Sequence, residues 1–156
     1  MKKKSSSLTT VVSLRAQQCR LKVPHPKILK ITHQILQFLQ VSKGELDILL
    51  TGDKAIERIN QDFLSHQGAT DVITFGSGIK KGKTWQIEQG NIVISLETAK
   101  KQAAEYGNDF FYEVCFYVCH GILHLLGWND ATPSQRDRML NKQTEILQHL
   151  KISNKK

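Results

Sequence analysis

Two kinds of hydrophobic spacing alternate along the chain and divide it into strands and helices. Alternating apolar and polar residues, rich in β-branched side chains, predict strands over Leu8–Leu21, Glu45–Thr51, Asp71–Phe75 and Asn91–Ser95. Apolar residues three and four positions apart predict five helices. The first follows Pro24 and Pro26 and reaches Leu39, and the others run from Gly52 to Phe63, from Leu96 to Tyr106, from Asn108 or Asp109 to Leu125, and from Thr132 to Leu150. This order of elements predicts an α/β (α+β) fold, a single domain with a small mixed sheet of about four strands packed with about five helices.

Capping and turn residues set several of the expected helix ends. Ser95 is expected to cap the helix that follows the fourth strand, and Gly107 to end that helix. Gly127 is expected to end the long helix, and Pro133 fits the first turn of the last one.

The polar run Ser65–Ala69 predicts a loop before the third strand. The glycine-containing, basic stretch Gly76–Gly90 predicts a hairpin, with a brief extended piece around Trp85 and Ile87.

Length and composition fit one soluble globular domain, since the chain has 156 residues, of which 40% are hydrophobic and 23% charged. We expect this domain over residues 8–152, between a basic disordered tail at 1–7 and a second basic tail at 153–156. No apolar run approaches the roughly 20 residues of a transmembrane helix, so neither a transmembrane helix nor a membrane partner is expected. Three cysteines are an odd number in a chain too long to need a disulfide framework, which fits a reducing cytoplasm.

The formal net charge of +8 favours a polyanionic partner, and nucleic acid is the obvious candidate. A solvated basic surface with lysine-rich termini is the alternative, because the two ends of the chain supply five of the 22 basic residues. Charge alone therefore does not decide the partner.

The segment Cys119–Asp130, with the sequence CHGILHLLGWND, carries the candidate chemistry. His120 and His124 are four residues apart on a predicted helix, so both imidazoles project from one face with their Cβ atoms about 5 to 6 Å apart. Gly127 can turn the chain back at the helix end, and Asp130 follows three residues later, where it can return as a third ligand. This pattern predicts a catalytic metal site, with zinc as the metal.

The offsets of these four residues match the metzincin signature H-E-x-x-H-x-x-G-x-x-H, with aspartate in the last place. In zincin proteases the glutamate beside the first histidine activates water, and here that position is Gly121. Peptide hydrolysis by that mechanism is therefore not expected.

A histidine pair at this spacing also occurs as surface decoration or as hydrogen-bonded core histidines. The metal is favoured by the apolar neighbours, because two partly buried imidazoles are costly without a partner. These neighbours are Ile122, Leu123, Leu125 and Leu126.

Three further side chains of the same helix have two interpretations each. Glu113 lies seven residues before His120 on the same face and is either a catalytic or orienting carboxylate or a structural one. Cys115 and Cys119 can in principle join a metal site, but inert buried thiols are the commoner case on apolar stretches.

This segment resembles the YbeY endoribonucleases, single-domain bacterial metalloproteins of rRNA maturation and ribosome quality control. The family signature H-G-x-L-H-L-x-G-Y/W-D-H matches His120-Gly121, Leu123-His124-Leu125, Gly127 and Trp128 in place. A second family segment is similar to Asn60 and Thr70–Phe75, and a third to Gly90–Ser95 followed by Gln102-Ala103. The resemblance covers about Leu46 to Asp130.

The chain departs from the family pattern at positions that bear on chemistry. Asp130 stands at the third histidine ligand and Asn129 at the aspartate before it, so the ligand set becomes His, His, Asp. Leu64 stands at the family's arginine, which removes a bidentate phosphate donor. Asn91 replaces the aspartate of the third segment.

The resemblance implies a cytoplasmic, single-strand-specific, metal-dependent endoribonuclease in 16S rRNA 3′-end maturation and ribosome quality control. One zinc ion per chain, held by His120, His124 and Asp130, is expected to polarise a phosphoryl oxygen and activate water, with Glu113 as a further catalytic candidate. The expected partners are rRNA, its precursors, and the small ribosomal subunit or its proteins. The residues expected to hold the RNA backbone, each also compatible with an ordinary solvated surface, are Arg58, Lys80, Lys81 and Lys83.

Two other functions remain open at this point. A metal-stabilised ribosome-assembly factor would bind RNA or a ribosomal protein and would have lost turnover together with the arginine and the third histidine. Metal-dependent hydrolysis of a peptide or amide is disfavoured by Gly121.

Overall fold

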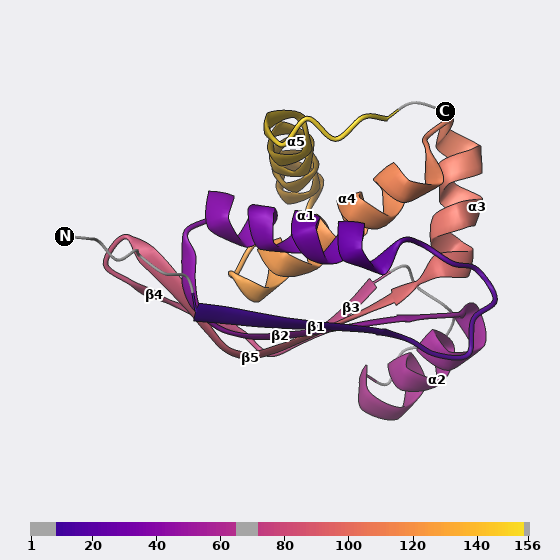
Figure 1. The fold of residues 1–156 in the computed structure, drawn as a ribbon, viewed down its shortest axis with the longest axis horizontal. Coiled ribbons are helices and arrows are strands. Elements are labelled where there is room, and N and C mark those ends of the chain that lie inside the picture. Colours follow the sequence, from indigo (N-terminus) through magenta and orange to yellow (C-terminus); the bar gives the residue numbers. More distant parts are fainter. Residues whose placement is uncertain (1–8, 65–71, 155–156) are drawn as a thin grey trace.

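Five strands form one mixed sheet in the computed structural model, which describes residues 9–64 and 72–154 (Figure 1). The strands are β1 (Thr9–Ala16), β2 (Val41–Thr51), β3 (Val72–Phe75), β4 (Gly78–Lys81) and β5 (Thr84–Ser95). The order is β1-β2-β5-β3, with β1, β2 and β5 parallel to one another. The first half of β5 pairs with β4 and the second half with β3, both antiparallel.

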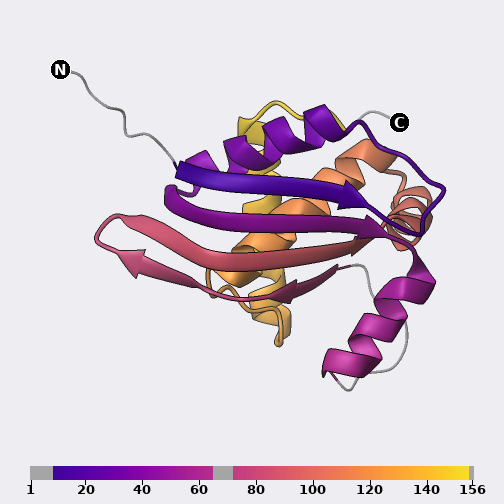
Figure 2. The ribbon, with the colours of Figure 1, turned by 60° about the horizontal axis from the view of Figure 1, so that its bottom comes forward.

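Of the five helices in the described residues, four lie on one side of the sheet and one lies on the other (Figures 1 and 2). The covering helices are α1 (His25–Phe38), α3 (Leu96–Tyr106), α4 (Phe110–Leu125) and α5 (Pro133–His149), and the single helix is α2 (Asp53–Leu64). The main hydrophobic core lies between the sheet and the four helices, whereas α2 packs over a small cluster of Ile56, Ile73 and Val93. None of the helices in the described ranges is long and apolar enough to cross a membrane.

Helix α4 lies at the centre of the covering layer and carries most of the candidate site. Ten of its residues are buried, and only a few partly exposed positions remain along it. Helices that are apolar all round are buried on all sides, and α4 packs against α1, α3, α5 and the sheet. The candidate histidines therefore stand on one of the most firmly held elements of the molecule.

The fold class and the helix ends agree with the sequence prediction. Ser95 Oγ accepts a hydrogen bond from Thr98 N at 3.1 Å, Asp109 caps α4 through Tyr112 N at 3.1 Å, and Gly107 ends α3 with φ of 70°. The predicted loop Ser65–Ala69, residues Thr70 and Asp71, and the terminal segments 1–8 and 155–156 lie outside the described residues.

The strand boundaries differ from the prediction in three places. β1 ends at Ala16, not Leu21, and β2 begins at Val41, four residues before the predicted start. The predicted hairpin over Gly76–Gly90 is present as β4 and the first half of β5, but its arms are full strands, so the sheet has a fifth strand and β5 is continuous. Gly44 explains how the polar start of β2 joins the sheet, because a Cβ there would lie 2.0 Å from the carbonyl oxygen of Ile87.

A polar cluster joins the start of α2 to the start of α3. The Asp53 carboxylate accepts hydrogen bonds from Ser95 Oγ and Thr98 Oγ1, both at 2.5 Å. Burial acts to raise the pKa of Asp53, but the hydrogen bonds from Ser95 and Thr98 and the positive charge of Lys101 outweigh it, so this pKa lies below its usual value.

Candidate metal centre

Two histidines of α4 and one aspartate beyond its end bring three potential ligand atoms together. His120 Nε2 lies 3.0 Å from His124 Nε2 and 3.4 Å from Asp130 Oδ2, and His124 Nε2 lies 3.3 Å from the same oxygen. Zinc–ligand bonds of about 2.0 to 2.2 Å at tetrahedral angles place ligand atoms roughly 3.3 to 3.6 Å apart. The two distances to Asp130 fall within this range, and the distance between the two histidine nitrogens is about 0.3 Å shorter, so a small rotation of the rings brings the three atoms to the spacing that one zinc ion requires.

Hydrogen bonds from the far side of each ring fix which nitrogen faces the centre. His120 Nδ1 lies 2.9 Å from Gln143 Oε1, while Gln143 Nε2 donates to the carbonyl of Phe116 at 3.1 Å. Because that carbonyl can only accept, the oxygen end of the amide faces His120, and Nδ1 of the ring is the donor. His124 Nδ1 likewise donates to the carbonyl of Trp128 at 3.0 Å. In both rings Nε2 is therefore the nitrogen that faces the centre as a potential metal ligand.

Two imidazole Nε2 atoms and a carboxylate oxygen facing one point repel each other unless a proton or a metal ion lies among them. The histidine side chains are 22% and 25% exposed and that of Asp130 is 41% exposed, so the centre is open on one side. Three protein ligands with an open position are the arrangement of catalytic zinc sites, whereas structural sites are closed by four. The residues present fit a catalytic zinc ion.

The turn that ends α4 brings Asp130 back to the histidines. Gly127 has φ of 95°, and the amides of Gly127 and Trp128 donate to the carbonyls of His124 and Leu123, both at 3.0 Å. This pair of bonds is a Schellman motif, and it also presents the Trp128 carbonyl to His124 Nδ1. One glycine turn therefore orients the second ligand and returns the third.

Gly121 has a packing role at the position where zincin proteases carry their glutamate. A Cβ there would lie 2.9 Å from both Cδ1 and Cγ2 of Ile92, because α4 rests directly on β5. A side chain at this position therefore requires Ile92 to shift.

Glu113 is buried near the start of α4 and is not brought to the three ligand atoms. Seven residues separate it from His120, which is about 10 Å along the helix axis. Its Oε1 accepts a hydrogen bond from Asn108 Nδ2 at 2.9 Å. Both Glu113 and His120 line a cleft of about 700 Å³ between α3, α4 and α5.

Cys115 and Cys119 are fully buried among the core residues and do not belong to the ligand group found in the described residues. Burial raises the pKa of each thiol to about 12. Neither is a thiolate near neutral pH, so both are inert core side chains.

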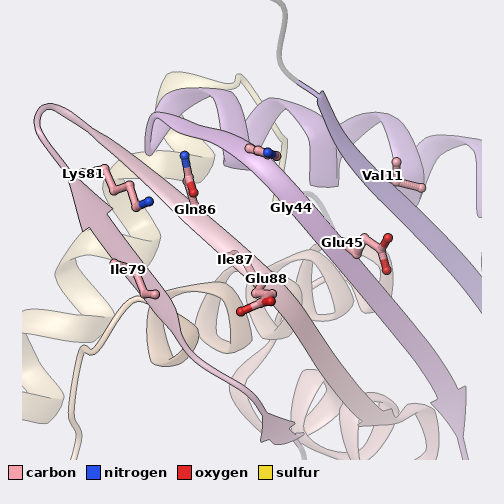
Figure 3. A pocket seen from close by; sticks show the side chains of 9 residues that line it. Val11, Gly44, Glu45, Ile79, Lys81, Gln86, Ile87 and Glu88 are labelled. Atoms are coloured by element: carbon pink, nitrogen blue, oxygen red, sulfur yellow. The ribbon is translucent and has the colours of Figure 1, made fainter.

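The four basic residues expected to bind RNA are not gathered at the metal centre. Arg58 belongs to α2, on the face of the sheet opposite α4, and Lys83 lies in the turn between β4 and β5 (Figure 2). Lys80 Nζ lies 5.8 Å from the ring centroid of Trp85, whereas Lys81, one position along the strand, points to the opposite face. Figure 3 shows Lys81 at a shallow pocket on that opposite face. The pocket has a volume of about 500 Å³, and its lining includes the acidic side chains of Glu45 and Glu88.

Residues of the other family-like segments have structural positions away from the ligands. Tyr117 donates from its hydroxyl to Gln102 Oε1, which ties α3 to α4, and Asn60 is buried on α2. Asn91 is paired in register with Asp47 and, by strand alternation, points away from the face that α4 covers.

Sequence reasoning missed two residues of α5 that contact the site. Gln143, which orients His120, is only 1% exposed and lies on the same buried stripe of α5 as Met139, Ile146 and Leu147. A polar residue within that apolar stripe was the sequence signal that could have identified Gln143 as a site residue. Arg136 Nη1 donates to the carbonyls of Asp130 and Ala131 at 3.3 and 3.4 Å, and nothing in its sequence context indicates this.

Comparison with known proteins agrees with the resemblance seen in the sequence. A family model described as Endoribonuclease YbeY matches residues 13–151. The Endoribonuclease YbeY of Geobacter metallireducens is 31% identical over 141 residues, which are 87% of this chain and 93% of the relative. That of Desulforamulus reducens is 34% identical over 137 residues, 81% of this chain and 88% of the relative.

A third relative is longer than this chain. The Endoribonuclease YbeY of Myxococcus xanthus is 40% identical over 110 residues, 70% of this chain but 37% of that protein. The solution structure of a Thermotoga maritima protein superposes with a TM-score of 0.56 at 18% identity over 92% of both chains, which shows a shared fold.

Proposed function

Because the chain belongs to the YbeY endoribonuclease family, we propose that it is a zinc-dependent endoribonuclease that cuts single-stranded RNA in precursors of ribosomal RNA. The observation that carries the zinc dependence is the convergence of His120 Nε2, His124 Nε2 and Asp130 Oδ2 within 3.0 to 3.4 Å of one another. The proposal places the protein in the cytoplasm, acting at the 3′ end of 16S rRNA and in contact with the small ribosomal subunit.

In this function the zinc ligands and the groups that orient them have separate roles. A zinc ion held there supplies Lewis-acid polarisation of a phosphoryl oxygen and activation of a water molecule. Gln143 and the Trp128 carbonyl keep the Nδ1 protons on the outer side of His120 and His124, so that both Nε2 atoms stay available. The 41% exposure of Asp130 leaves one side of the centre open to a phosphodiester.

Glu113 takes a binding role in this proposal. Its carboxylate lies about two helical turns from His120 and in the wall of the same cleft, so it meets the substrate beyond the reacting phosphate. Arg58, Lys80, Lys81 and Lys83 are proposed to attract longer RNA over the outer surface, since they lie on separate faces and not around the ligands.

Single-turnover cleavage of an end-labelled rRNA precursor tests the proposal. We expect scission by zinc-loaded protein, no scission after chelation, and none by His124→Ala. His33→Ala is the matched control, because His33 is an exposed histidine of α1. RNA binding by the wild-type protein without any scission would reject the nuclease and support a non-catalytic assembly factor.

A further inference from the structure

The cleft beside His120 has the dimensions of a site for a small organic group. It has a volume of about 700 Å³ and is lined by residues of α3, α4 and α5. Small-molecule sites commonly have volumes of about 300 to 1,000 Å³. Because His120 is part of the wall, anything bound in the cleft lies next to the proposed zinc ligands.

Aromatic and aliphatic side chains form an exposed wall in this cleft. Tyr106 at the end of α3 is 68% exposed and Leu140 on α5 is 46% exposed, two of the most exposed large apolar side chains in the described residues. The rings of Tyr112 and Phe116 stack with centroids 5.9 Å apart. Aromatic side chains at the surface of RNA-binding proteins stack on unpaired bases, whatever the base, because each base has a flat π face.

Arg136 brings positive charge to the end of the cleft near the metal centre. One of its nitrogens, Nη1, donates to the carbonyls of Asp130 and Ala131, so the guanidinium rests on the loop that carries the third ligand. Among the described residues no acidic side chain forms a salt bridge with Arg136. A guanidinium without a carboxylate partner is suited to a phosphate, which its planar fork can bind through two parallel hydrogen bonds.

The opposite end of the cleft has the opposite charge. Glu113 is 4% exposed, and its Oε2 has no hydrogen bond within the described residues, while its Oε1 is held by Asn108. A carboxylate there repels a phosphate and can accept hydrogen bonds from the N–H groups of a base edge. Glu113 lies about 10 Å along the axis of α4 from His120, roughly the distance from the phosphate of a nucleotide to the far edge of its base.

From this arrangement we propose that the cleft binds one unpaired nucleotide next to the phosphate to be cut. Arg136 binds a phosphate at the end near the zinc ligands, Tyr106 and Tyr112 stack on the base, and Glu113 meets the edge of the base. The location of the cleaved bond relative to this nucleotide rests on the proposed nuclease function, whereas the binding of the nucleotide does not.

The test measures the binding of short single-stranded RNA that carries 2′-O-methyl groups and cannot be cut. Fluorescence anisotropy is recorded with an intact oligonucleotide and with a series in which one position at a time lacks its base. In wild-type protein we expect one abasic position to weaken binding about 5- to 100-fold. In Tyr106→Ala the same abasic position should weaken binding clearly less than in wild type, because one of the two aromatic side chains that stack on the base is already gone.

Matched variants separate this cleft from general electrostatics and general surface effects. Arg136→Gln should weaken binding about tenfold more than Arg138→Gln, since both arginines are exposed on α5 and Arg138 does not line the cleft. Ile79→Ala, at an exposed apolar residue on β4, should leave the abasic effect as in wild type. Zinc content is measured for each variant to show that the metal centre is retained.

Each outcome decides one of the two proposals. The cleft assignment is overturned if Tyr106→Ala keeps the full abasic effect, or if Arg136→Gln and Arg138→Gln bind alike. Wild-type protein that shows the abasic effect but never cuts RNA supports the cleft and rejects the nuclease. If wild-type protein cuts RNA while the cleft variants match their controls, the nuclease is supported and the cleft assignment is rejected. Absence of any RNA binding overturns both proposals.

Discussion

Replacement of Gln143 by methionine should weaken zinc binding although Gln143 is not itself a ligand. Its Oε1 accepts from His120 Nδ1 at 2.9 Å and its Nε2 donates to Phe116 O at 3.1 Å, within a site where Gln143 is 1% exposed. Methionine has a similar length and makes neither hydrogen bond, so the tautomer and ring orientation of His120 are no longer fixed. Loss of such outer partners typically lowers metal affinity about 10- to 100-fold, or roughly 1.4 to 2.7 kcal/mol.

Competition with a chromogenic chelator gives the zinc affinity, and urea unfolding of the metal-free protein gives the cost to the fold. We expect the free energy of unfolding to fall by only about 1 to 2 kcal/mol, because the Phe116 carbonyl keeps its bond within α4. Gln148→Met is the control, an exposed glutamine on the same helix. Gln143→Glu should recover part of the affinity, because a carboxylate still accepts from Nδ1. Equal zinc affinity in Gln143→Met and Gln148→Met would refute the role assigned to Gln143.

Three further changes follow from other contacts. Asp130→His should retain or tighten zinc binding in the same chelator assay, because imidazole reaches further than carboxylate; a weaker affinity would show that the turn specifically accommodates the carboxylate. Asp53→Asn should lower the free energy of unfolding at pH 7 by about 1 kcal/mol. Because the folded pKa of Asp53 is depressed, the difference from wild type should shrink as pH falls below the usual value of about 3.9 and be lost as pH falls through the folded pKa; a difference at pH 3 as large as that at pH 7 would contradict this. Gly121→Ala should destabilise the protein by about 1 to 2 kcal/mol in thermal unfolding, because the new methyl group would lie 2.9 Å from Ile92. The higher helix propensity of alanine offsets only part of the cost of this contact. A higher melting temperature than wild type would show that Ile92 moves aside.

Local signals in the sequence predicted the parts of the fold that depend on neighbouring residues. The cap at Asp109, the glycine turn at Gly127 and the helical spacing between them fixed α4 and its end. A hairpin over Gly76–Gly90 was predicted, but the extent of its strands and the start of β2 were not, because GIKK and VSKG are short and polar. GIKK pairs with the first half of β5, and VSKG pairs with both β1 and the first half of β5. Register between distant segments is set by tertiary packing, which single-sequence patterns do not contain.

The same distinction applies to the candidate site. His120, His124 and Asp130 lie within eleven consecutive residues, so helix geometry and one turn were enough to predict their approach. Gln143 and Arg136 reach the site only because α5 packs against α4, and their positions follow from that packing. The lysines of the β4–β5 hairpin show the converse, since Lys80 and Lys81 are adjacent in sequence and lie on opposite faces of the sheet.

The zinc content of the purified protein tests the central claim most directly. Elemental analysis should find one zinc ion per chain in wild type and in His33→Ala, and less than a tenth of that in His120→Ala. Added zinc should raise the melting temperature of metal-free wild type but not that of His120→Ala, because a ligand that binds only the folded state stabilises it. Wild-type protein without stoichiometric zinc, together with a His120→Ala variant of unchanged metal content and melting temperature, would contradict the assignment of His120, His124 and Asp130 as a zinc centre.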